Sequence, residues 1–188
     1  MRKLFALFFV AIVLSSCVPQ EVTITHQRTL GRYRTTEIQW VGGGRDFKGV
    51  IQNNPFQVSD AELERIIWPI VSRSITFMRT NVTSTPNETR RPGFRVELFF
   101  FAPTNIGGDT LCEPPRGGLP APQIRTDELV ILGALCLRGN VLTTARATTG
   151  YTQPGEDRFE RAIVQLTRTL FPRVRENRRR ACRPPHCR

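Results

Sequence analysis

Residues 94–101 read Phe-Arg-Val-Glu-Leu-Phe-Phe-Phe, and this stretch is the most apolar strand candidate of the chain. In a strand, side chains alternate between two faces, so Phe94 and every second residue after it share one face. Arg95 and the residues in step with it share the other face. A strand that is apolar on both faces belongs in the middle of a sheet. We expect Glu97, beside Arg95, to be an exposed or paired charge on a sheet face that no helix covers.

Other stretches show the alternation of apolar and polar residues that is typical of half-buried strands. The triplet Gly42-Gly43-Gly44 lies between two of them. No Gly-Lys-Ser/Thr follows it, so it favours a hairpin turn over a phosphate-binding loop. Arg138-Gly139-Asn140 is a second predicted hairpin turn. The expected strands are residues 21–27, 35–41, 47–52, 128–137 and 141–149.

Two stretches have helical spacing. Ser59 and Glu62 form a capping box, which predicts a helix start. The apolar face of this helix carries Leu63, Ile66, Ile67, Ile70, Phe77 and Met78. Pro69 lies inside it, so we expect the helix to kink or split near Trp68. A second helix starts near Asp157 and Glu160, and its apolar face carries Phe159, Ile163, Leu166 and Leu170.

The element order is three strands, a helix, three strands and a helix, which predicts an α+β fold. We expect a two-layer sandwich whose antiparallel or mixed sheet has about five to six strands with two helices on one face. The chain is 39% hydrophobic and 23% charged, which favours a globular domain over disorder. The expected organisation is a signal at 1–16, a tether at 17–20, one domain at 21–172 and a basic tail at 173–188.

The amino terminus has the features of an export signal. Arg2 and Lys3 precede an apolar run over residues 4–14, which is too short for the roughly 20 residues of a membrane-spanning helix. The run ends in Leu14-Ser15-Ser16-Cys17, which resembles the lipobox of bacterial lipoproteins. The resemblance implies cleavage before Cys17, acylation of its thiol and a membrane anchor on the periplasmic side. Val18, in place of Asp, favours the outer membrane.

Four cysteines remain after Cys17, and they allow three pairings. We favour the two local pairs, Cys112 with Cys136 and Cys182 with Cys187. Such pairs fit the oxidising compartment that the export signal implies. Cys182, His186 and Cys187 could also be written as a metal cluster, but a disulfide explains two of them more simply. We therefore predict no metal and no cofactor.

The net charge of +11 is concentrated in the carboxyl-terminal tail, where residues 173–188 carry seven arginines and one glutamate. We predict no nucleic-acid partner, because the signal indicates export and the tail lacks aromatic residues for base stacking. Two readings stay open: a tail that binds lipid phosphates, wall carboxylates or an acidic envelope protein, and a solvated tail without a role. The candidate contacts are Arg178, Arg179, Arg180 and Arg183.

Several short motifs carry a resemblance across most of the domain: Asn54-Pro55-Phe56, residues 99–103, Cys112 with Cys136, Arg158-Phe159 and Leu170-Phe171-Pro172. Together they resemble a group of small, uncharacterised proteobacterial envelope lipoproteins. The resemblance implies a lipid-anchored α+β domain and no particular activity.

Motifs for catalysis are scarce. The chain has no Gly-x-Ser-x-Gly elbow and no His-Glu-x-x-His, and its two histidines, His26 and His186, have no nucleophile beside them. We therefore expect a non-enzymatic envelope lipoprotein with an accessory or scaffolding role. The alternative is a periplasmic hydrolase or ligand-binding protein, with a pocket under the long Pro- and Gly-rich loop of residues 102–127.

Overall fold

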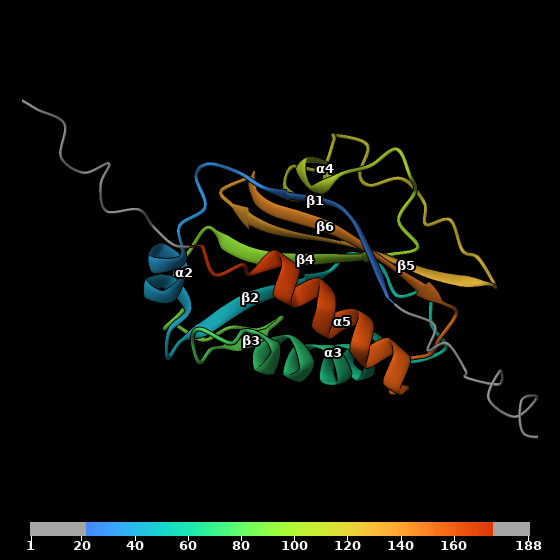
Figure 1. Cartoon of the computed structure of the whole chain (residues 1–188), viewed down its shortest axis with the longest axis horizontal. Helices are drawn as coiled ribbons and strands as arrows, with labels where there is room; N and C mark the ends of the chain where they lie inside the picture. Colours follow the sequence, from blue (N-terminus) through green and yellow to red (C-terminus); the bar gives the residue numbers. More distant parts are fainter. Residues whose placement is uncertain (1–21, 175–188) are drawn as a thin grey trace, which may run out of the picture.

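The computed structural model of the protein describes residues 22–174. The strands in this part of the chain form a six-stranded sheet in the order β1-β6-β5-β4-β2-β3 (Figure 1). The expected α+β class with a mixed sheet is confirmed. The elements are β1 (Thr23–Thr29), α2 (Thr35–Gly42), β2 (Asp46–Ile51), α3 (Asp60–Ser74), β3 (Asn81–Thr83), β4 (Phe94–Phe100), α4 (Gly108–Cys112), β5 (Glu128–Leu137), β6 (Asn140–Gly150) and α5 (Asp157–Leu170).

Strand β4 lies inside the sheet, as its sequence predicts. It pairs antiparallel with β5 and parallel with β2, and β2 in turn pairs parallel with the short β3. Strands β5 and β6 form the predicted hairpin, and their turn places both Arg138 and Gly139 at positive φ, 49° and 85°. Two such residues give the turn a twist that matches the strands on either side.

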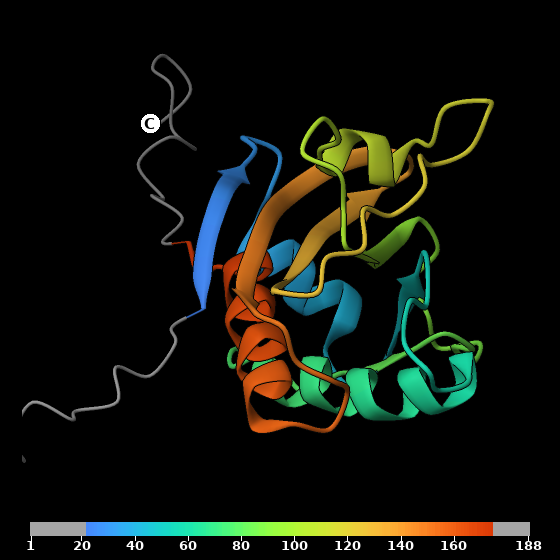
Figure 2. The ribbon, with the colours of Figure 1, turned by 90° about the vertical axis from the view of Figure 1, so that its right-hand side faces the viewer.

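Helices α3 and α5 cover one face of the sheet, as expected, and lie side by side (Figures 1 and 2). Two glycines let them approach closely. A Cβ atom at Gly49 would lie 2.7 Å from the ring of Trp68 in α3, and one at Gly133 would lie 2.8 Å from Leu170 in α5. The helices and this face enclose the larger hydrophobic core, whose burial is the main stabilising contribution to the fold.

The second face of the sheet is also covered, contrary to the expectation that it is open. Residues 101–127 pass over β4, β5 and β6, include the short helix α4, and bury a second core. Glu97 is only 1% exposed and is paired with Arg95. Arg95 Nη2 also donates to the carbonyl oxygen of Cys112, at 2.6 Å. The charged side chains on this face thus form a network beneath a loop.

The loop is held down by two further contacts. Cys112 and Cys136 form a disulfide between α4 and β5, which is one of the two pairs favoured above. The buried guanidinium of Arg146 donates to the carbonyl oxygens of Ala102, Pro103 and Ile106 at 2.7, 2.8 and 3.1 Å. Burial lowers the pKa of Arg146, because the charged form loses its hydration.

Residues 35–41 form helix α2, not the expected strand. Ile38 and Trp40 are two residues apart, which favoured a strand, but Trp40 is 62% exposed. The buried positions are Thr35, Ile38, Val41 and Gly42, which follow a helical period. Gly42-Gly43-Gly44 therefore ends a helix instead of forming a hairpin: Gly43 N–H donates to the carbonyl oxygen of Gln39 at 2.8 Å.

The ends of the two long helices differ in detail from the predicted caps. Ser59 Oγ accepts from the N–H of Glu62 at 3.2 Å, as expected, but the Glu62 side chain pairs with Arg65. Helix α3 continues through Pro69 without splitting. In α5 the N-cap residue is Glu156, whose carboxylate accepts from the Thr152 hydroxyl at 2.7 Å.

We predict that Gly49→Ala destabilises the protein by about 1–3 kcal/mol, because the added methyl group would press against the buried Trp68 ring. Urea denaturation measures this change. The matched control is Gly31→Ala, since a Cβ atom there meets nothing within 4 Å; it should change stability by less than about 0.5 kcal/mol. Equal stability of the two variants would contradict the close packing of α3 on β2.

We also predict that replacing Cys112 and Cys136 together with alanine lowers the free energy of unfolding by about 3 kcal/mol. The disulfide spans 24 residues, and without it the unfolded chain regains the entropy of that open loop. Urea denaturation of the wild type and the variant, each with and without reductant, measures the effect. A variant as stable as the oxidised wild type would contradict the prediction.

Candidate interaction surface

Several residues singled out in the sequence lie outside the described part of the chain: Cys17, Cys182, Cys187, His186 and the tail arginines Arg178, Arg179, Arg180 and Arg183. His26 is exposed on β1, where a bulge gives it a φ of 51°, and its ring contacts the hydroxyl of its neighbour Thr25.

Between residues 22 and 174, no three His, Cys, Asp or Glu side chains group as metal ligands. No helix of these residues is long and apolar enough to span a bilayer.

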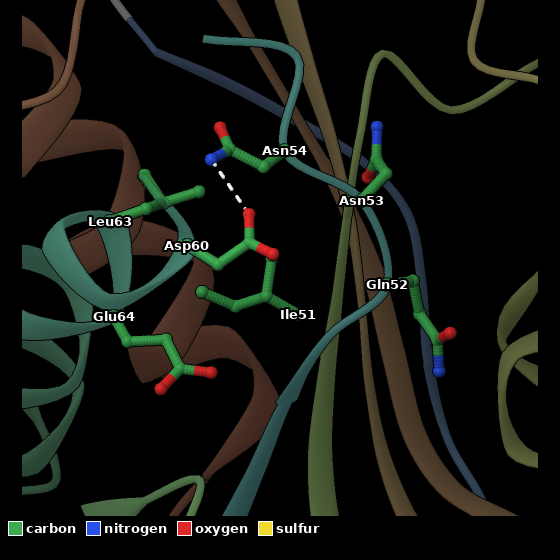
Figure 3. Close-up of a pocket in the computed structure, with 7 residues that line it drawn as sticks. All are labelled: Ile51, Gln52, Asn53, Asn54, Asp60, Leu63 and Glu64. Carbon is green, nitrogen blue, oxygen red and sulfur yellow. Dashed lines mark hydrogen bonds between the residues drawn. The ribbon is translucent and has the colours of Figure 1, made fainter. Parts of the chain in front are cut away.

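A small hollow lies where β2 leads into α3 (Figure 3). Its volume is about 120 Å³, well below the 300–1,000 Å³ of typical ligand pockets. The acidic side chains at its wall already have partners. Asp60 accepts from Asn54 Nδ2 at 2.9 Å, and Glu64 accepts from the Ser84 hydroxyl. Water fits this hollow better than a substrate does.

The space under residues 102–127, where the sequence led us to consider a pocket, is filled by the second core. A hollow of about 400 Å³ lies beside α4 instead, next to the turn between β5 and β6. Its charged residues are Arg32, Asp109 and Glu113, a mixture without a nucleophile or a histidine. This hollow thus lacks the paired nucleophile and base of a Ser–His or Cys–His site.

The molecule has two distinct ends along the strand direction. We call the end where β1 begins the proximal end, and the end where β1 finishes the distal end. Val22 precedes β1 at the proximal end, whereas Val174 lies at the distal end, where its N–H donates to Thr35 Oγ1 at 2.9 Å (Figure 1). The chain therefore enters and leaves the described domain at opposite ends.

The distal end is rich in arginine. Helix α2 and the connections at this end carry eight arginines and two glutamates, Glu37 and Glu88. These segments are residues 30–45, 75–81, 84–93, 138–139 and 171–174. Within the described residues, none of these eight arginines is paired with a carboxylate. On the side of β6, the neighbouring Asp109 and Glu113 offset part of this charge. On the side of β2 and β3, the acidic neighbours are Glu37, Asp46 and Glu88.

We define the distal arginine surface as Trp40, Arg45, Phe77, Met78, Arg79, Arg90 and Arg91. The guanidinium of Arg91 lies 4.3 Å from the centre of the exposed Trp40 ring, in the range of a cation–π interaction. Arg79 and Arg90 are exposed. Sequence analysis missed this surface because its residues come from α2 and three connections that meet only in the folded chain.

Asp46 organises the backbone beneath this surface. Its carboxylate accepts from Asn87 N–H and from Asn81 Nδ2, both at 2.9 Å. These two donors, the Asn87 N–H first, hold the pKa of Asp46 below its ordinary value, because they stabilise the charged form. The Asp46 carboxylate thus binds its own loop, and the arginines of this surface stay available to a partner.

No protein-family model matches the sequence, and no curated protein matches it. Among solved structures, the chain is similar to the PelC dodecamer from Paraburkholderia phytofirmans in space group P6, with 14% identity over 80% of this chain and 94% of that one and a TM-score of 0.41. A point variant of that dodecamer in space group C2 shows 15% identity over 82% of this chain and 100% of that one, with a TM-score of 0.43. We draw no functional conclusion from a likeness this distant.

We predict that Asp46 stabilises the fold above the ordinary aspartate pKa of about 3.9, and that this contribution is lost as the pH falls through its depressed folded pKa. Carboxyl NMR titration measures the pKa directly. Asn81→Ala should raise it toward the ordinary value by removing one donor. An Asp46 that titrates at the ordinary value in the wild type would contradict the assigned hydrogen bonds.

Proposed function

We propose that the protein is an exported lipoprotein of the bacterial cell envelope, anchored on the periplasmic side of the outer membrane by lipid on Cys17. Its domain binds another envelope component and catalyses no reaction. The observation that carries the proposal is the lipobox Leu14-Ser15-Ser16-Cys17 after a basic start and a short apolar run. The Cys112–Cys136 disulfide supports export, because disulfides persist in oxidising compartments.

The position of Cys17 close to β1 has a geometric consequence. Four residues lie between Cys17 and Val22, and the extended chain between these two positions spans at most about 18 Å. The lipid therefore keeps the proximal end of the domain close to the membrane. The distal arginine surface then faces the periplasm, where it is open to a partner.

The charge of the distal end favours an anionic partner. Arginine binds carboxylates and phosphates through two parallel hydrogen bonds, and the distal arginines have no carboxylate partner among residues 22–174. The tail with Arg178, Arg179, Arg180 and Arg183 follows from this same end, after Val174. An anionic envelope component fits the domain and its tail together; nucleic acid is not the partner of an exported protein.

We predict that Cys17→Ser abolishes both metabolic labelling with palmitate and recovery of the protein in the membrane fraction. The reason is that the thiol is the acceptor of the first acyl chains. Cys182→Ser is the matched control, because it replaces another cysteine without touching residues 14–17; it should label and fractionate like the wild type. An unlabelled wild-type protein would refute the lipid anchor.

A further inference from the structure

Two shallow, open hollows lie along residues 75–81 on the distal arginine surface, and we refer to them together as the groove. Their volumes are about 820 and 330 Å³, and Arg79 and Thr80 lie in the walls of both. The wall of the larger hollow includes Phe77 and Met78, which are half-buried and also pack against the main core, and the smaller hollow is flanked by Arg45. Apolar and cationic side chains thus lie next to each other along residues 75–81.

The backbone of this groove is fixed from both sides. Gln39 Nε2 of α2 donates to the carbonyl oxygen of Phe77 at 2.9 Å. In the turn after α2, Gly44 N–H donates to the carbonyl oxygen of Arg79 at 2.8 Å. Thr80 Oγ1 donates to the carbonyl oxygen of Arg45 at 3.0 Å. A partner therefore meets a preformed groove, which lowers the entropy cost of binding.

The charges in the groove are available to a partner to different degrees. Arg79 is exposed and has no partner among residues 22–174. Arg45 uses one N–H for a long contact of 3.4 Å to the carbonyl oxygen of Thr89. Arg73, at the far side of the larger hollow, is paired with Glu160. Asp46 is the acidic residue in the wall of the smaller hollow, and it is engaged by Asn81 and Asn87.

The combination of groups selects among anionic partners. An acidic polysaccharide offers carboxylates but no large apolar side chain for Phe77 and Met78. The lipid proposed on Cys17 holds the proximal end at the bilayer, so the distal arginine surface faces away from the membrane. The arginine-rich tail of this chain is repelled by Arg45 and Arg79. An acidic polypeptide segment supplies carboxylates and apolar side chains on one extended backbone.

We propose that the groove along residues 75–81 binds an acidic segment of a partner protein, with an apolar side chain of that segment on Phe77 and Met78 and its carboxylates on Arg45 and Arg79. This inference names the partner class of the surface in the proposed function and rests on that proposal. Carboxylates can form paired hydrogen bonds with the guanidinium groups, and burial of the apolar side chain adds hydrophobic stabilisation.

The test uses the full-length protein in detergent and a fluorescent synthetic peptide that alternates glutamate and phenylalanine. Fluorescence anisotropy measures its dissociation constant. We expect Arg79→Glu to weaken binding at least about tenfold, which corresponds to about 1.4 kcal/mol, and Phe77→Ser to weaken it as well. Arg116→Glu is the matched control: Arg116 is exposed in the loop after α4 and should change binding less than twofold.

Peptides with glutamine in place of glutamate, or serine in place of phenylalanine, should bind more weakly than the parent peptide. Equal binding of the parent peptide to the wild type and Arg79→Glu would overturn the proposal. Binding of anionic phospholipid vesicles or polygalacturonate through Arg79, without peptide binding, would overturn it too. These measurements do not depend on Cys17, so a failure of the groove and a failure of the lipid anchor give separate results.

Discussion

Strand β4 imposes the constraint on which the rest of the structure depends: it carries large apolar side chains on both faces and must be covered on both. Helices α3 and α5 cover one face by the regular packing of helices on a sheet. The other face has no long helix, and an irregular segment covers it instead. Such a segment leaves many backbone groups in need of partners. The polar side chains beneath it therefore donate hydrogen bonds to its carbonyl oxygens.

The covering segment is held on the sheet by three contacts, which involve Arg146, Arg95 and the Cys112–Cys136 disulfide. Arg146 satisfies three loop carbonyl groups, Arg95 bridges Glu97 and the carbonyl oxygen of Cys112, and Cys136 fixes α4 covalently to β5. A buried charge is costly unless it has partners. Each of these side chains therefore stabilises the loop only while the loop keeps its position, and this mutual dependence makes the second face cooperative.

The sequence predicted elements whose signals are local and long. The alternation in residues 94–101, the Ser59 cap and the turn at Gly139 each gave the correct element. Helix α2 was missed because it is short, has no side-chain cap, and places Ile38 and Trp40 two residues apart. Strand β3 has three residues, too few for a pattern. The distal arginine surface has no linear signature, since packing of α2 against residues 77–80 creates it.

The opposite exits of the chain give the domain a mechanical character. A load applied between Val22 and Val174 runs along the strands, because the first lies before β1 and the second is tied to Thr35 beyond its end. The hydrogen bonds between β1 and β6 would then be stretched all at once, in shear, and would not open one after another. A domain built in this way resists a pull applied along its strands between residues 22 and 174.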